Sequence, residues 1–309
     1  MEQLTLIDNS QPDVFDKAVG ASILAPVVTR PIAGIGNGDY LLDMPGYLGT
    51  YTHKNGRPVA LGVVSESYQL VQMRDLTDAA EKIMKETFSS EQLSQVKIRD
   101  SSAKNGAWVQ RQYVVEAISE ELKYGNAVTS TKTVGTTVAA TCSITTSFDG
   151  GSSTALNIGT LDLVCANGMT ALNATDCFSK KHTKGATIDV FREWFNALGP
   201  RFAKQVETMR HWSDTSVTWS QIEDTIHALP GMSEKKAERL LDRAEREVHD
   251  RGSNVYAITS ALTYYSSHDS DEFPVRRTGH DTVATTLANR QQEVARWTSS
   301  QVFQTLLAA

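Results

Sequence analysis

Residues 143–167 read SITTSFDGGSSTALNIGTLDLVCAN, and this stretch decides the fold of the chain. Residues 136–148 are rich in Thr, Val and Ile, and residues 154–165 alternate apolar side chains with small or polar ones. Both patterns are typical of β-strands. Asp149 and Gly150 stand between the two runs, and Asp-Gly favours a hairpin because primed turns need residues that tolerate positive φ. The stretch therefore predicts a β-hairpin in the core of the protein.

Further strands are expected on the N-terminal side of this hairpin. Residues 46–64 hold Asn-Gly between two β-rich runs, which predicts another hairpin. A helix is expected at residues 75–88, where apolar side chains recur at helical spacing. The remaining strands are expected at residues 69–72, 95–100 and 106–118.

After residue 167 the apolar spacing becomes helical. Helices are expected at residues 189–212, 218–229, 234–250, 253–267 and 278–307. Gly199-Pro200 is expected to interrupt the first of them, because proline breaks a helix interior. Ser233 is a good N-cap for the third.

Strands followed by helices indicate an α+β fold. We expect a mostly antiparallel sheet with one inserted helix, followed by a helical C-terminal half. The expected organisation is a loop-rich N-terminal arm at residues 1–38, an antiparallel α+β core at residues 39–185, and a helical region packed on the core at residues 186–309.

Composition narrows the classes of protein. The sequence has no apolar run of about 18 residues, so no transmembrane helix and no membrane partner are expected. The N-terminus lacks the pattern of a secretory signal, and three cysteines, two of them in apolar strands, suit a reducing cytoplasm. The net charge of −6 argues against binding nucleic acid through bulk positive charge, although a local basic patch is compatible with it.

Four stretches resemble a family of phage and plasmid-like proteins grouped as domain of unknown function 932. They are LGVVSESYQLVQMRDL at residues 61–76, SFDGGSS…LDLVCANGM at residues 147–169, FSKKHTKG at residues 178–185 and SNVYAITSALTYYSSHD at residues 253–269. The resemblance departs at Phe148, where many relatives have His, and in an expanded polar stretch at residues 221–251. It implies a mobile-element origin and, by association, work on DNA in the cytoplasm of a bacterial host. The order of strands and helices is also similar to that of ring-forming annealing proteins, without a shared motif.

The cluster best suited to binding a ligand follows the hairpin at residues 180–185, which read KKHTKG. Lysine ammonium groups and helix N-terminal amides bind phosphate, so nucleic-acid contacts are predicted at Lys180, Lys181, His182 and Lys184. A solvated loop that offsets nearby carboxylates is the alternative.

Other basic residues are candidates for the same surface. Arg111 and Tyr113 share one face of a strand by period two, and together they would stack on unpaired bases. Arg276 and Arg277 form a second basic pair, for which an ordinary salt bridge in a loop is the alternative. A helix-hairpin-helix resemblance at residues 229–241 lacks its second glycine, which favours a plain Pro-Gly turn.

The sequence lacks the signatures of catalysis and cofactor binding. It has no G-x-S-x-G, Walker A, G-x-G-x-x-G, HExxH or CxxC motif. No catalytic residue, metal or cofactor is therefore expected, and an enzyme is the least favoured class.

Two functions remain open from the sequence. The first is a DNA-metabolism protein that binds, and in its fuller form anneals, single-stranded DNA as a homo-oligomer. The second is a counter-defence or regulatory protein that binds a host protein without catalysis.

Overall fold

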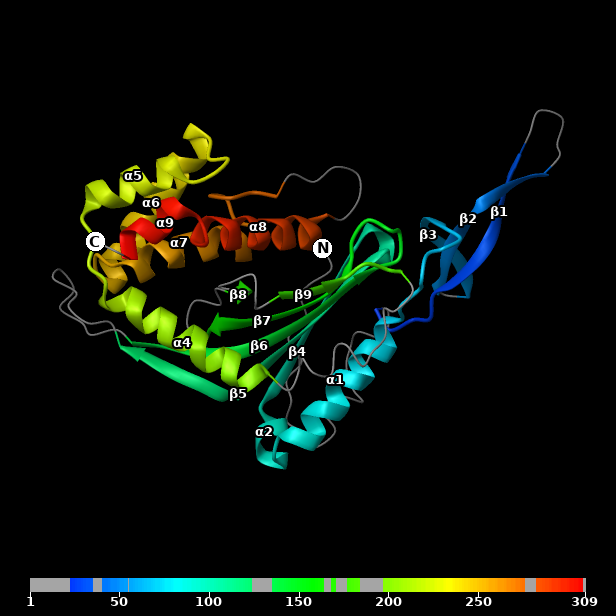
Figure 1. Ribbon diagram of the computed structural model, residues 1–309, viewed down its shortest axis with the longest axis horizontal. Helices are drawn as coiled ribbons and strands as arrows, with labels where there is room; N and C mark the ends of the chain where they lie inside the picture. Colours follow the sequence, from blue (N-terminus) through cyan, green and yellow to red (C-terminus); the bar gives the residue numbers. More distant parts are fainter. Residues whose placement is uncertain are drawn as a thin grey trace.

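A computed structural model of the protein describes residues 23–35, 41–54, 56–123, 135–163, 168–170, 177–183, 197–275 and 282–307. These residues form antiparallel sheets in the N-terminal half and helices mainly in the C-terminal half (Figure 1). The α+β class expected from the sequence is confirmed.

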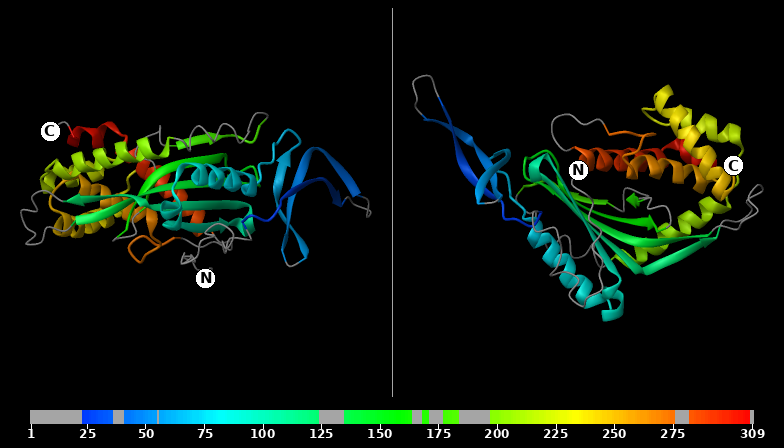
Figure 2. Two further views of the ribbon diagram at one scale, coloured as in Figure 1. Left: turned by 90° about the horizontal axis from the view of Figure 1, so that it is seen from below. Right: turned by 180° about the vertical axis from the view of Figure 1, so that it is seen from behind.

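A three-stranded antiparallel sheet projects from the body of the molecule (Figures 1 and 2). It consists of β1 (Val28–Ile35), β2 (Leu41–Lys54) and β3 (Arg57–Ser65), and we call it the β-arm. Lys54 faces Arg57 across β2 and β3, and Gly56 has a φ of +76°, as a tight turn requires. The hairpin expected here is confirmed.

Within the loop-rich arm expected at residues 1–38, strand β1 corrects the expectation for residues 28–35, while residues 1–22 and 36–38 lie outside the described residues. Seven of its residues pair with β2, from Val28 opposite Tyr51 to Ile35 opposite Leu41. Pro31 obscured the strand in the sequence, but β1 is an edge strand, where a residue without an N–H is tolerated.

Within the described ranges, the main sheet has six antiparallel strands in the order β4-β5-β6-β7-β8, with β9 also paired to β7. Its members are β4 (Val96–Ala103), β5 (Trp108–Lys123), β6 (Gly135–Ser147), β7 (Thr154–Asp162), β8 (Gly168–Thr170) and β9 (Cys177–Lys180). A short 3₁₀ turn, η2 (Lys104–Gly106), joins β4 to β5. Residues 69–72, expected as a strand, are irregular.

The central hairpin is confirmed as β6 and β7, but its connection is wider than a two-residue turn. The Asp149 carboxylate accepts a hydrogen bond from the Gly151 amide at 2.8 Å, and Gly150 has a φ of +73°. The Ser147 hydroxyl donates to the Ser152 carbonyl at 2.9 Å. Side chains of Asp and Ser that bond to nearby backbone thus shape a six-residue loop, residues 148–153.

Helices α1 (Met73–Thr87) and α2 (Ser90–Ser94) lie between the two sheets in sequence. The C-terminal helices are α4 (Leu198–Asp214), α5 (Trp219–Ala228), α6 (Glu234–Arg251), α7 (Val255–Ser267), α8 (Val283–Thr298) and α9 (Gln301–Leu307). None of the helices in the described ranges is long and apolar enough to span a bilayer.

One expected helix boundary is wrong, and another coincides with the start of a described helix. Helix α4 begins at Leu198 and Pro200 lies in its first turn, where a missing N–H costs nothing; residues 189–196, on the other side of the expected interruption at Gly199-Pro200, lie outside the described residues. The single helix expected at residues 278–307 is two helices, α8 and α9. The Ser300 hydroxyl accepts from the Phe303 amide at 3.3 Å, and so caps the start of the second.

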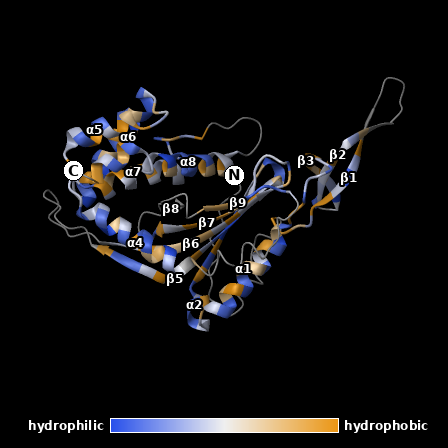
Figure 3. Ribbon diagram, viewed as in Figure 1, coloured by the Kyte–Doolittle hydropathy of each residue, from blue (hydrophilic) through white to orange (hydrophobic). Residues whose placement is uncertain are grey.

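The larger of two apolar clusters among the described residues joins the sheet to the helices, and Figure 3 colours these strands and helices by the hydropathy of their residues. The strand register places Val138, Cys142 and Ile144 of β6 on the same sheet face. That face is covered by α1, whose Glu81 bonds Tyr113, and by α4 and α7 near Val138.

Candidate nucleic-acid interface

His182 is part of the interior. Its side chain is 6% exposed, and its ring stacks on Tyr68 with centroids 4.6 Å apart. The ring Nδ1 lies 3.1 Å from the Gln69 carbonyl, and Nε2 lies 3.3 Å from the Thr154 hydroxyl. Burial lowers the pKa of His182. A neutral, fully engaged imidazole does not bind phosphate, so the predicted contact at His182 is wrong.

Arg111 and Tyr113 are also interior, at 1% and 0% exposure. Arg111 donates two hydrogen bonds of 2.8 Å to Asp100 and one of 3.1 Å to Glu81, and the Tyr113 hydroxyl donates to the same Glu81 at 2.9 Å. They do share a sheet face, but α1 covers it. The prediction that this pair stacks on bases is wrong, because bases have no access to it.

One guanidinium, that of Arg111, pairs with two carboxylates in this cluster, those of Asp100 and Glu81. Burial by itself lowers the pKa of Arg111, but its hydrogen bonds with Asp100 and the charge of Glu81 raise it overall. Burial raises the pKa of Glu81, against the hydrogen bonds from Tyr113 and Arg111. The cluster is therefore an internal network of ion pairs in which each charged group has a partner. Removing one of these partners would lower the stability of the fold, because it leaves a buried charge unpaired.

Lys180 and Lys181 remain accessible. Lys180 ends β9 opposite Thr154, at the end of the sheet that carries the β6–β7 loop, and Lys181 follows it as an exposed residue. At the same end, Lys104 of η2 reaches the loop and donates to Asp149 at 2.8 Å. Burial by itself raises the pKa of Asp149, but the hydrogen bond from Lys104 helps to lower it overall. Lys104, Lys180 and Lys181 therefore lie at the end of the sheet that carries the β6–β7 loop.

The β-arm adds a fourth lysine. The Nζ atom of Lys54 lies 4.0 Å from the position that a Cβ on Gly106 would take, which brings the end of β2 to η2. We call Lys54, Lys104, Lys180 and Lys181 the basic corner. Sequence reasoning missed Lys54 and Lys104, each of which precedes an Asn-Gly turn, because nothing in the sequence brings those two turns together.

The basic corner carries unbalanced positive charge. Only Lys104 has a carboxylate partner there; Lys54, Lys180 and Lys181 form no ion pair with the described residues. Residues 44–65 contain no Asp or Glu, in a chain with 36 acidic and 30 basic residues. Exposed ammonium groups without partners attract anions.

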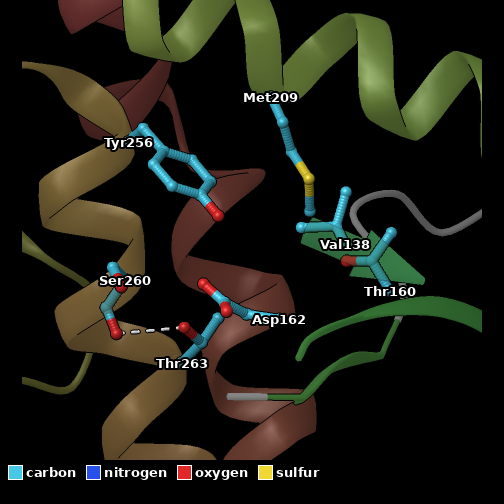
Figure 4. Close-up of a pocket in the computed structure, with 7 residues that line it drawn as sticks. All are labelled: Val138, Thr160, Asp162, Met209, Tyr256, Ser260 and Thr263. Atoms are coloured by element: carbon cyan, nitrogen blue, oxygen red, sulfur yellow. Dashed lines mark hydrogen bonds between the residues drawn. The ribbon is translucent and has the colours of Figure 1, made fainter. Parts of the chain in front are cut away.

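A second polar cluster lies at the opposite end of the sheet. Arg251 contacts Glu247 at 2.6 Å and Asp162 at 3.4 Å, and each of these side chains is at most 5% exposed. Beside it is a cavity of about 10 Å³, enough for one water molecule. Figure 4 shows its lining, which comes from the sheet, α4 and α7: Val138, Thr160, Asp162, Met209, Tyr256, Ser260 and Thr263. The cavity is too small for an organic ligand.

The remaining predicted contacts, Lys184, Arg276 and Arg277, lie outside the described residues. Among the residues that are described, no three His, Cys, Asp or Glu side chains are grouped to hold a metal ion.

Comparison with known proteins gives one family. The family model described as a domain of unknown function (DUF932) matches residues 60–301. No curated protein and no solved structure matches the chain. The matched residues include β4 to β9 and nearly all of the helical half. The protein therefore belongs to the family defined by domain of unknown function 932.

Proposed function

We propose that this protein binds single-stranded DNA at the basic corner and works as a homo-oligomer. The observation that carries the proposal is that three lysines without an ion pair among the described residues lie at the same end of the main sheet, in an otherwise acidic chain. Lysine is a strongly hydrated point charge that contacts phosphate without base specificity. Annealing of strands, and an origin on a phage or plasmid, are parts of the same proposal.

The shape of the corner favours a single strand over a duplex. Lys54 belongs to the β-arm and Lys180 to the main sheet, so a backbone that contacts both has to follow two separate sheets. A single strand bends at little cost, whereas duplex DNA has a persistence length of about 150 base pairs. The same lysines would bind a duplex more weakly.

The test is fluorescence polarisation with a labelled oligothymidine in about 50 mM salt, where phosphate contacts are strongest. We compare the native chain with the double variant Lys180→Ala, Lys181→Ala. Two lost phosphate contacts lower the salt dependence of log K by about 1.4, because each single-strand contact contributes about 0.7. The affinity falls uniformly across sequences.

The matched control is Lys204→Ala, Lys235→Ala, which removes the same charge from exposed sites on α4 and α6. It should bind as the native chain does. Equal losses in both double variants would show that net charge alone decides binding. Failure of the native chain to bind at this salt concentration would refute the proposal and favour the host-protein alternative.

A further inference from the structure

The β-arm has two faces of different character. Register places Arg30 opposite Gly49 and Gly49 opposite Val63, while Tyr47 lies two residues from Gly49 and so on the same face. Val28 joins them from β1. We call Val28, Arg30, Tyr47 and Val63 the outer face. The Tyr51 ring covers Gly49 on this face, because a Cβ there would lie 2.6 Å from ring atoms.

The opposite face of the β-arm is held against the main sheet. The Thr50 hydroxyl, fully buried, donates to the Phe148 carbonyl at 2.6 Å. Gly62 meets the backbone of Asp149, and Val64 lies against Gly150. One face of the β-arm is therefore fixed to the β6–β7 loop, and the outer face points away from it.

The outer face is apolar and accessible. Val63 is 55% exposed, Tyr47 52% and Val28 40%. With Met44, they make up four of the six large hydrophobic side chains that are exposed in the described part of the chain. Exposed apolar side chains gathered on one element mark an interaction surface, whereas scattered ones need no explanation.

A complementary surface lies at the far end of the main sheet. Glu121 pairs with Thr137 across β5 and β6, and the Leu163 amide donates to the Thr137 carbonyl at 2.9 Å. These three residues form a row, which we call the distal row. Leu163 is 37% exposed, and Glu121 is exposed and makes no ion pair with the described residues. The row thus offers an apolar side chain beside a carboxylate that has no ion-pair partner in the part of the chain that the structure describes.

We propose that the outer face of the β-arm docks on the distal row of a second copy of this chain. Arg30, an exposed guanidinium amid apolar residues, pairs with Glu121 of the second copy, and Tyr47 and Val63 cover Leu163 there. Charge supports this occupant, because residues 44–65 lack any acidic residue while the whole chain has a net charge of −6. The inference rests on the homo-oligomer in the proposed function.

Two different surfaces in contact make a head-to-tail arrangement. Such heterologous contacts close into a ring or continue as a filament, according to the rotation between copies. Each copy would present its basic corner beside the junction, since the β-arm contributes both Lys54 and the outer face.

The experiment is sedimentation velocity of the purified full chain without DNA, from about 1 to 50 µM. This range brackets the dissociation constants of many specific complexes of moderate affinity. Arg30→Glu and Glu121→Arg each place like charges together, and each should weaken assembly at least about tenfold. The double variant Arg30→Glu, Glu121→Arg restores the pair with its charges exchanged and should recover assembly. Tyr47→Ala should weaken assembly without any change of charge.

Lys204→Glu combined with Glu223→Arg is the control, with the same charge changes at exposed sites on α4 and α5, and should assemble normally. A native chain that stays monomeric throughout the range overturns the inference. The inference is also overturned if both single variants dissociate and the double variant Arg30→Glu, Glu121→Arg stays dissociated as well. Oligonucleotide binding is measured on the same samples: Tyr47→Ala that assembles normally but loses DNA would assign the outer face to nucleic acid instead.

Discussion

At the scale of single residues, the basic side chains differ in whether the fold supplies them with a carboxylate partner. Arg111 finds Asp100 on the next strand and Glu81 on α1, while Lys180 and Lys181 find none in the described chain. Period-two alternation correctly put Arg111 and Tyr113 on one face. It does not say which face a helix will cover, because that depends on packing between segments distant in sequence. His182 was misread for the same reason, since its partners Tyr68 and Gln69 lie more than a hundred residues away.

His182 should make stability depend on pH. Its folded-state pKa is lowered by burial, so the unfolded chain binds the proton more readily. The contribution is present above the unfolded pKa of about 6.5 and is lost as pH falls through the lowered folded pKa. Urea unfolding at pH 7.5 and 5.5 should show a smaller free energy of unfolding at pH 5.5, with up to about 1.4 kcal/mol per pH unit from one histidine.

The variant His182→Gln should show a shallower dependence on pH. Part of it persists, because burial also lowers the pKa of His268. The control is His249→Gln, whose side chain is 86% exposed. An unchanged pH dependence in His182→Gln would mean that the ring does not titrate as its burial demands.

At the scale of elements, short-range turn chemistry was a reliable guide. The Asn-Gly of the β-arm and the Asp-Gly of the central hairpin both mark hairpins in the structure. Strand β1 escaped notice because its proline and glycines resemble a loop, and only pairing with β2 makes it a strand. The sequence does not predict the break between α8 and α9, because Ser299-Ser300 does not disturb the apolar spacing. Docking of the β-arm on the main sheet had no signal in the sequence.

Gly62 tests that docking. A Cβ at this position would lie 2.6 Å from the Asp149 Cα, a backbone atom that cannot rotate aside. Gly62→Ala should therefore push the β-arm from the β6–β7 loop and break the bond from Thr50 to Phe148. Overpacking of this kind costs about 1–3 kcal/mol, visible as faster amide hydrogen exchange in β3 and residues 147–153.

Gly199→Ala is the matched control, because a Cβ there meets nothing within 4 Å. It lies in the first turn of α4 and should leave exchange in the β-arm unchanged. Unaltered protection of β3 in Gly62→Ala would show that the loop yields freely to the added methyl group.

At the scale of the whole molecule, the α+β class followed from strands preceding helices, and the apolar core explains why the halves belong together. Leu156 and Ile158 of the sheet lie in one cluster with Met209 of α4 and Tyr256 of α7. Neither half buries its apolar surface alone. The expected domain boundaries at residues 38 and 185 remain a prediction.

A shared core predicts shared unfolding. Met209 is 1% exposed between α4 and the sheet, so Met209→Ala should cost about 2–5 kcal/mol. Urea unfolding followed by circular dichroism at 222 nm, mainly from helices, and by amide hydrogen exchange in β6 and β7 should shift to one lower midpoint. Met44→Ala, at an exposed site, should leave the midpoint in place. Separate transitions for the two signals would mean that the halves unfold independently.

The contact between Gln69 and His182 has a consequence for synthesis. The Gln69 amide donates to the His182 carbonyl at 2.9 Å, and the imidazole approaches the Gln69 carbonyl, which closes a span of 113 residues. A ribosome adds about 5–20 residues per second, so the second partner emerges on the order of 10 s after the first. During that interval the nascent β-arm lacks the β6–β7 loop, which Thr50, Gly62 and Val64 contact in the folded chain. We expect chaperones that bind exposed apolar strands to hold the newborn chain at this stage, and a pause in translation near residue 182 would lengthen it.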